Sequence, residues 1–218
     1  MKVYPRRAQR FVRLGLGAIF FLSSCSILPE PETLDVYHLP STSVPTTAQV
    51  DKLPWLLRIT TPHSNRLTDA ERVLMLREDS RISTYKGARW SDPPSVLLRN
   101  RFTNAFRSDG RLSTISVDNP NLLADLELDG DLSAFQVEYT HGTPAAVIRF
   151  YAALVQPARN RVIAERSFEI SQPVEGAGMP EVIRAFGRSA DNLAGEIIDW
   201  TVEQGTAQLS AQQSAVHR

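Results

Sequence analysis

The alternation of apolar and polar residues divides the chain into short strand-like runs and longer helix-like runs. Residues 56–60, 72–76 and 82–85 are short apolar runs bounded by polar residues or proline, and each predicts a β-strand. Residues 112–117 predict a fourth strand of the same kind.

Longer strands are predicted in the second half of the chain. Within residues 124–139 the apolar positions alternate until the period shifts by one residue, which predicts a bulge or a bend. The alternating residues are Leu126, Leu128 and Leu132, followed by Phe135, Val137 and Tyr139. Residues 145–155 and 161–170 predict two further strands, and the polar turn between them predicts an antiparallel hairpin.

Two runs with helical spacing complete the pattern. Residues 91–94 (Ser-Asp-Pro-Pro) offer an N-cap followed by proline, and Leu98, Phe102 and Phe106 then recur every four residues until Gly110. A second helix starts near Pro180 and has one apolar face. That face comprises Val182, Ile183, Phe186, Ala190, Leu193, Ile197 and Trp200. The fold class predicted is α+β: a mainly antiparallel sheet with two amphipathic helices packed on one face.

The first 24 residues have the layout of an export signal. Residues 1–13 carry five basic and no acidic side chains, and residues 14–22 form an apolar run that is too short to span a membrane, which takes about 20 residues. The run ends in Leu22-Ser23-Ser24-Cys25, which resembles the bacterial lipobox. The resemblance implies cleavage between Ser24 and Cys25 and acylation of Cys25.

Cys25 is the only cysteine in the chain, so the alternative of a disulfide has no partner, and burial does not suit its place after an apolar signal. Several acyl chains on Cys25 would anchor the protein stably. Ser26 follows, rather than the aspartate that retains lipoproteins at the inner membrane. The resemblance therefore implies location at the outer membrane, facing the periplasm.

The predicted organisation is a signal peptide at 1–24, a lipidated, proline-rich tether at 25–54, a single domain at 55–203 and a flexible tail at 204–218. Within the tether, residues 36–39 are strand-like and are expected to pack on the domain edge. Without the signal the chain has 19 basic and 24 acidic residues, a mildly acidic balance that argues against nucleic acid as a partner.

The order of these features resembles a known family. Residues 85–94 read YKGARWSDPP ahead of the first helix, the second helix ends in EIIDW, and Tyr37-His38-Leu39 follows the lipobox. This order is similar to the ABC-type transport auxiliary lipoproteins, the PqiC-like family, although Pro94 replaces the leucine usual there. The resemblance implies an outer-membrane lipoprotein that works with MCE-type lipid transport systems. Its partners would be an MCE-domain protein and an ABC transporter complex.

Tyr85 and Trp90 are the candidate partner-binding residues, because both precede the first helix and exposed aromatic residues dominate binding energy at interfaces. The alternative for Trp90 is packing as a hydrophobic lead-in to the helix. Trp55 fits either role, and Trp200 fits the core because it lies on the apolar helix face.

Catalytic and metal sites are not predicted. The four histidines are scattered without metal-ligand spacing, and Ser189 lies within a predicted helix, where we expect it on the solvent side. Asp125, Glu127, Asp129 and Asp131 alternate along one strand. Such a pattern indicates the wet face of the strand or, less often, a cation site.

Three functions remain open. The first is an anchored docking or scaffold component of a lipid-transport bridge, for which a homo-oligomer would be suitable. The second is a lipoprotein that itself binds lipid or glycolipid cargo in an apolar cavity between helices and sheet. The third is a structural lipoprotein of the envelope. No cofactor is expected for any of them.

Overall fold

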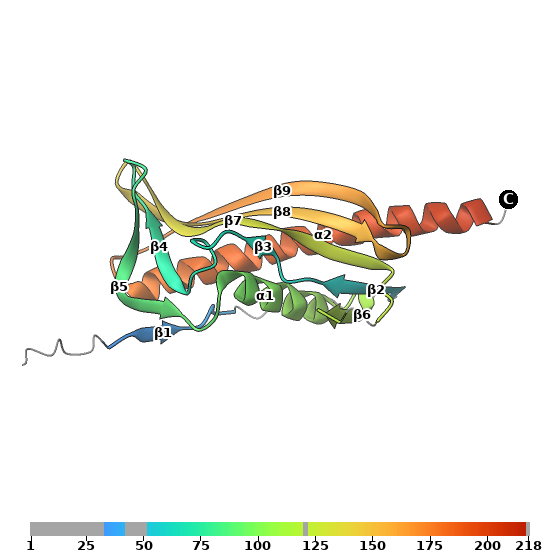
Figure 1. Ribbon diagram of the computed structural model, residues 1–218, viewed down its shortest axis with the longest axis horizontal. Helices are drawn as coiled ribbons and strands as arrows, with labels where there is room; N and C mark the ends of the chain where they lie inside the picture. The colour runs from blue at the N-terminus through green and yellow to red at the C-terminus, as the bar shows by residue number, and fades with distance from the viewer. Residues whose placement is uncertain (1–32, 42–51, 120–121, 217–218) are drawn as a thin grey trace, which may run out of the picture. The chain divides into compact units, whose positions relative to one another are not determined.

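The computed structural model describes residues 33–41, 52–119 and 122–216 (Figure 1). One compact unit begins at Leu34, and residues 1–33 belong to a separate unit of which only Thr33 is described. Cys25, Ser24 and most of the predicted tether therefore lie outside the described residues.

The described residues contain nine strands joined in one sheet. The strands are β1 (Asp35–Tyr37), β2 (Leu53–Ile59), β3 (His63–Ser64), β4 (Arg72–Leu76), β5 (Ile82–Trp90), β6 (Leu112–Val117), β7 (Leu126–Thr140), β8 (Thr143–Gln156) and β9 (Arg161–Pro173). The main path runs β1-β5-β4-β7-β2-β6, while β3 and β8 also pair with β7, and β9 pairs with β8.

The sheet is mixed, which corrects the prediction of a mainly antiparallel sheet. The predicted hairpin β8–β9 is antiparallel, as are β7–β8 and β4–β5. By contrast, β2 runs parallel to both β6 and β7, β4 and β3 run parallel to β7, and β1 runs parallel to β5. These parallel pairs join segments far apart in the chain, and apolar periodicity within a strand does not indicate its neighbour.

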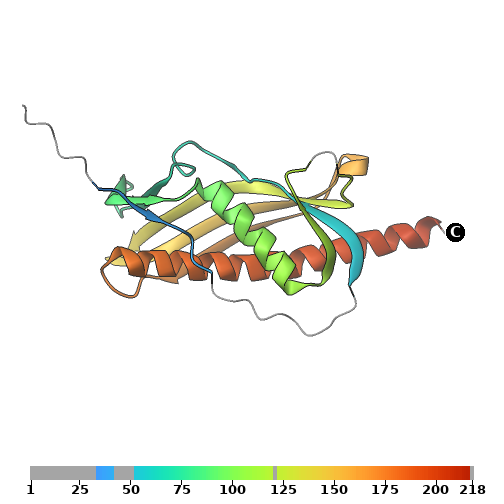
Figure 2. The same ribbon diagram turned by 90° about the horizontal axis from the view of Figure 1, so that it is seen from below.

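Two helices cover one face of the sheet, as predicted. Figure 2 shows α1 (Pro94–Asp109) and α2 (Met179–Val216) in front of the strands. The first helix ends at Gly110, which has a φ of 75°, a left-handed conformation that suits glycine at a helix C-terminus. At its other end, Pro93 is the N-cap without a side-chain hydrogen bond, so the expected cap from residues 91–92 is absent. Instead, Asp69 Oδ1 accepts a hydrogen bond from the backbone N–H of Ser95 at 3.1 Å.

The predicted irregularity in the long strand β7 is confirmed. The register of β7 against β8 shifts between Leu132 and Ala134, so one additional residue is accommodated and the next apolar side chains return to the helix-facing side. The hairpin between β8 and β9 closes through a short 3₁₀ turn, Pro157–Arg159, and Asn160 takes a left-handed conformation with a φ of 46°.

Large aromatic side chains fill the space between the helices and the sheet. Phe135 of β7 and Phe186 of α2 stack with ring centroids 4.7 Å apart, and Trp90 meets both rings edge-on. A second contact joins Phe102 of α1 to Phe150 of β8, with ring centroids 5.3 Å apart. These rings are buried and belong to one continuous hydrophobic cluster.

The second helix extends further than the sequence pattern indicates. Residues 204–216, predicted as a flexible tail, continue α2 to Val216, and Figure 1 shows this last part reaching past the end of the sheet. Its residues are mostly good helix formers, and adding residues to a formed helix is easier than starting one. Gln212 and Gln156 also exchange two side-chain hydrogen bonds, at 3.0 and 3.1 Å, which fix this part of the helix to β8.

Candidate partner-binding surfaces

Trp90 is a core residue in this structure. Its side chain is 0% exposed and its ring meets the stacked rings of Phe135 and Phe186 edge-on, so it offers no surface to a partner. The position matches the alternative of a hydrophobic lead-in to α1. Trp55 and Trp200 are also buried. The aromatic residues nearest the first helix therefore stabilise the fold, and partner binding is not carried by Trp90.

Tyr85 is half-buried on β5 and lies beside Tyr139 of β7. Burial, together with a hydrogen bond between the two hydroxyl groups, raises the pKa of Tyr85 well above its ordinary value of 10. Its hydroxyl is therefore protonated at neutral pH. Of the two predicted partner-binding residues, only Tyr85 retains an accessible part.

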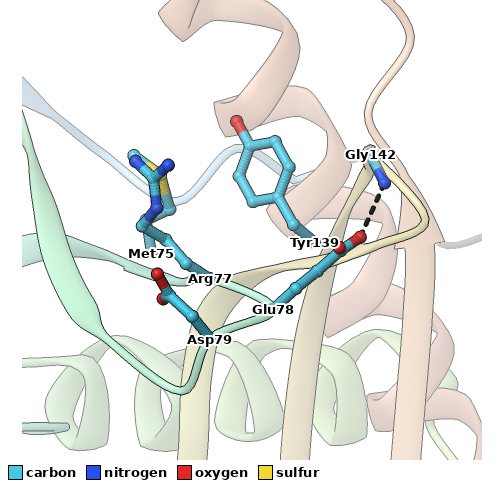
Figure 3. A pocket seen from close by; sticks show the side chains of 6 residues that line it. All are labelled: Met75, Arg77, Glu78, Asp79, Tyr139 and Gly142. Carbon is cyan, nitrogen blue, oxygen red and sulfur yellow. Dashed lines mark hydrogen bonds between the residues drawn. The ribbon is translucent and has the colours of Figure 1, made fainter.

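Tyr139 lines an open hollow of about 460 Å³ at the end of the β4–β5 hairpin. Figure 3 shows Arg77 and Tyr139 rising on either side of it, with Met75 beside Arg77. Glu78 closes one side by accepting a hydrogen bond at 2.7 Å from the backbone N–H of Gly142, in the turn between β7 and β8. The hollow combines a cation, two carboxylates, a phenol and a thioether, a set suited to surface contacts with an amphipathic partner.

The segment that leads from the tether into the domain is held on both helices. β1 pairs with β5, and beyond it the carbonyl oxygens of Leu39 and Pro40 accept hydrogen bonds from the guanidinium of Arg101 on α1. Pro40 also lies so close to Gly187 of α2 that a Cβ there would come within 2.8 Å of its ring. The prediction that residues 36–39 pack on the domain edge is confirmed.

Arg101 also forms an ion pair with Asp191 of α2 at 2.8 Å, and the two side chains are only 6% and 11% exposed. Burial lowers the pKa of Arg101, and the charge of Asp191 opposes this shift. Arginine remains charged in proteins, so the pair is a buried ion pair that joins α1, α2 and the tether segment. Sequence reasoning missed it, although a charged residue among the apolar positions of α1 was a visible signal.

The alternating carboxylates of β7 serve to attach β2. Asp125 accepts a hydrogen bond from the backbone N–H of Leu56 at 2.7 Å, and Asp129 accepts one from the Thr60 hydroxyl at 2.9 Å. Between them, Glu127 forms an ion pair with Arg58. These partners account for three of the four carboxylates as part of the fold, whereas Asp131 is exposed.

A shallow groove of about 540 Å³ separates β9 from α2. It is lined by residues 169–172 of β9 and by the helix residues Asp191, Asn192, Gly195 and Glu196. β9 pairs only with β8 in the described part of the chain, so its other edge is unpaired there.

Ser189 is buried, so the prediction of a solvent-side position was wrong. Its hydroxyl donates a hydrogen bond at 2.9 Å to the carbonyl oxygen of Ala146 in β8. Within the described ranges, no three His, Cys, Asp or Glu side chains are grouped so that they could hold a metal ion. The described helices also include none with both the length and the apolar character needed to cross a membrane.

Comparison with solved structures shows the same fold in other proteins. A protein of family DUF330 from Xanthomonas campestris is 24% identical, with a TM-score of 0.73 over 81% of this chain and 99% of its own. An uncharacterised protein is 18% identical, with a TM-score of 0.60 over 77% of this chain and 98% of its own. A hypothetical protein from Chlamydia trachomatis has a TM-score of 0.50 at 10% identity, over 71% of this chain and 99% of its own. No curated protein matches the sequence.

A family model described as "ABC-type transport auxiliary lipoprotein component" matches residues 37–198, well over half of the chain. It is the family that the order of the lipobox, the YKGARWSDPP segment and the last helix indicated. The chain belongs to the family of ABC-type transport auxiliary lipoprotein components.

Proposed function

We propose that this protein is an outer-membrane-anchored, periplasmic docking component of an MCE-type intermembrane lipid transport system. The observation that carries the proposal is the match of residues 37–198 to a family of transport auxiliary lipoproteins, in a chain whose Cys25 ends a lipobox-like signal. The family role as an auxiliary lipoprotein is shown, and the MCE partner and the outer membrane are the parts that we propose.

The physical requirements of such a component are modest. A transport bridge needs a fixed point at the far membrane, and acyl chains on Cys25 supply one without a membrane-spanning helix, since more than one chain gives stable anchoring. The folded domain then presents a rigid surface to the partner. The hydrogen bonds and the ion pair of Arg101 give that domain a defined attachment to the anchored segment.

Cargo binding is supported less well by the geometry. The cavity proposed for cargo lies between helices and sheet, and that space is filled by the stacked Phe135 and Phe186 and by Trp90 and their neighbours. The two hollows described above are open and are lined partly by charged groups. A membrane lipid could enter this space only by displacing packed aromatic side chains, which would cost several kcal/mol of folding free energy.

The anchoring step is tested by expressing the full chain and its Cys25→Ala variant in the same cells. We expect the intact mass of the wild-type protein to show loss of residues 1–24 and addition of acyl chains, and we expect it to fractionate with the outer membrane. The variant should show neither the loss of residues 1–24 nor the addition of acyl chains. A wild-type protein without acyl chains, or one found with the inner membrane, would contradict the proposal.

Extraction of the purified protein tests the cargo alternative in the same material. The docking account expects no phospholipid bound to the domain once the acylated terminus is absent, for example in a form with Cys25→Ser whose residues 1–24 are replaced by an ordinary cleavable secretion signal. Stoichiometric phospholipid in that form would favour cargo binding instead.

A further inference from the structure

The path by which the chain enters the domain limits how the domain can stand on the membrane. Residues 35–40 are fixed: β1 pairs with β5, the Ser91 N–H donates to the Tyr37 carbonyl at 2.8 Å, and Arg101 binds the two carbonyls that follow. The length of chain that links Cys25 to the fixed part therefore ends at Asp35. The rest of the predicted tether, which runs to residue 54, follows the fixed part and does not lengthen this link.

Asp35 follows Cys25 by ten positions, and even a fully extended chain of that length reaches at most about 35 Å. The second helix has 38 residues and so a length of about 57 Å. Figures 1 and 2 both show the start of β1, the β4–β5 turn and the start of α2 at one end of the sheet, and the C-terminus of α2 at the other. With Cys25 in the membrane, the domain cannot stand with the C-terminus of α2 towards the lipid.

The surface at the β1 end has the composition of a membrane-contacting surface. Leu34, Val36 and Ile82 are apolar and 56%, 49% and 46% exposed. The β4–β5 turn at the same end carries Arg77 and Arg81 together with Glu78 and Asp79, and Arg81 pairs with Asp79, so its charges balance. Exposed apolar side chains suit an interface with lipid, where they are buried, and the balanced charge of the turn does not oppose contact with anionic lipid.

The broad outer face of β7, β8 and β9 is unsuited to lying on that membrane. It carries several carboxylates, namely Asp131, Glu138, Glu165 and Glu169. Arg149 neutralises part of this charge through Glu138 and Glu169, but acidic groups predominate, and anionic lipid repels them. Charge therefore favours an upright domain over one lying on its sheet.

We propose that the β1 end of the domain, with Leu34, Val36 and Ile82, rests on the inner leaflet of the outer membrane, so that the C-terminal end of α2 points into the periplasm. This inference rests on the proposed acylation of Cys25. It leaves the opposite end, with the 92% exposed Leu123 and the last turns of α2, available to the transport partner.

The test uses the full-length lipoprotein, processed in cells and reconstituted into vesicles of phosphatidylethanolamine and phosphatidylglycerol. Acylation consumes the thiol of Cys25, so Ile82→Cys and Leu123→Cys each introduce one free thiol for an environment-sensitive fluorophore. Both positions are exposed and apolar, which makes Leu123→Cys a matched control. Ile82 lies far from Cys25 in sequence, so its position reports on the domain rather than on the anchor.

We expect nitroxide-labelled lipid to remove most of the fluorescence at residue 82 and to leave residue 123 unaffected, while aqueous iodide does the reverse. Equal lipid quenching at both positions, or quenching at residue 123 alone, would overturn the proposed orientation. Intact mass and flotation with the vesicles are measured on the same samples. If acyl chains are present and the protein floats, an absence of lipid quenching at residue 82 counts against the orientation alone. If acyl chains are absent, the proposed function fails, and the orientation with it.

Discussion

Replacement of Arg101 by methionine tests the attachment of the anchored segment to the domain. Methionine keeps most of the side-chain volume but removes the charge and every hydrogen-bond donor. The variant loses the ion pair with Asp191 and the bonds to the carbonyls of Leu39 and Pro40. It therefore removes the polar links from α1 to α2 and to the segment that follows β1, without opening a large cavity.

The magnitude follows from the burial of the pair. Because the side chains are 6% and 11% exposed, removal of Arg101 leaves the Asp191 carboxylate in a poorly solvated position, and breaking such a pair costs about 3–5 kcal/mol. Arg107 lies on the same helix and is exposed, so Arg107→Met should change the free energy of unfolding by less than about 0.5 kcal/mol. A double variant, Arg101→Met with Asp191→Leu, removes both charges and should recover part of the loss.

The assay is urea unfolding of the mature chain carrying Cys25→Ser, followed by far-ultraviolet circular dichroism at pH 7. Hydrogen exchange of residues 34–41, read by mass spectrometry, reports separately on the anchored segment, whose pairing with β5 should open more often in the variant. Faster exchange there, with unchanged exchange in β8, would show that Arg101 holds this segment in particular.

Two results would refute the reasoning. If Arg101→Met and Arg107→Met have the same unfolding free energy, the buried ion pair does not form as described. If the Arg101 variant is destabilised but residues 34–41 exchange at the wild-type rate, Arg101 joins the helices and does not hold the anchored segment.

Three further predictions concern the core, the second helix and the outer face of the sheet. Trp90→Ala should destabilise the domain by about 3–5 kcal/mol in urea unfolding, and Trp90→Phe by clearly less, because the ring fills the core; equal stability would contradict its burial. Gly195→Ala should stabilise α2 by about 1 kcal/mol, since no atom lies within 4 Å of the new Cβ. Gly205→Ala should destabilise α2, because its new Cβ would lie 2.8 Å from core side chains. A lower melting temperature for Gly195→Ala than for Gly205→Ala would contradict the packing of α2. A hydrogen bond from Arg149 lowers the pKa of Glu138 below its ordinary 4.5. The ionised Glu138 therefore contributes its full stabilisation above about pH 4.5, and this stabilisation is lost as pH falls through the lowered pKa. The difference in unfolding free energy between wild type and Glu138→Gln should shrink over that acid range, and a difference that grows there would contradict the prediction.

The local elements of this fold follow closely from periodicity. The predicted bounds of β4 and β6 coincide with the observed ones, and α1 ends where Gly110 indicated. Even the shift of register in β7 was visible as a break in a period of two. These features depend on neighbours in sequence, which is why a single chain is sufficient to predict them.

Pairing between distant strands could not be predicted in the same way. The parallel contact of β2 with β6 joins strands on either side of α1, and no pattern within either strand specifies it. The burial of Ser189 is similar, because a hydroxyl on a core-facing helix position is tolerated only through its bond to Ala146, a residue 43 positions away. Residues 204–216 lacked apolar periodicity, and contacts with β8 that only the folded chain brings together support the helix there.

The site was predictable only in part. The lipobox and the family could be recognised from residue order, because those signals are local. Tyr85 and Trp90 were grouped by their place before a helix, yet Tyr85 is half-buried against the core and Trp90 lies within it. The ion pair of Arg101 depends on the crossing of two helices, which the sequence does not specify.

The most direct test of the central claim is a crosslinking pull-down from cells that express the full-length protein or its Cys25→Ala variant, with bound proteins and lipids both identified. We predict that the wild-type protein recovers an MCE-domain protein from the envelope, and that the variant loses both its outer-membrane location and most of this partner. Recovery of lipid without any transport protein, or equal recovery by both forms, would contradict the account of an anchored docking component.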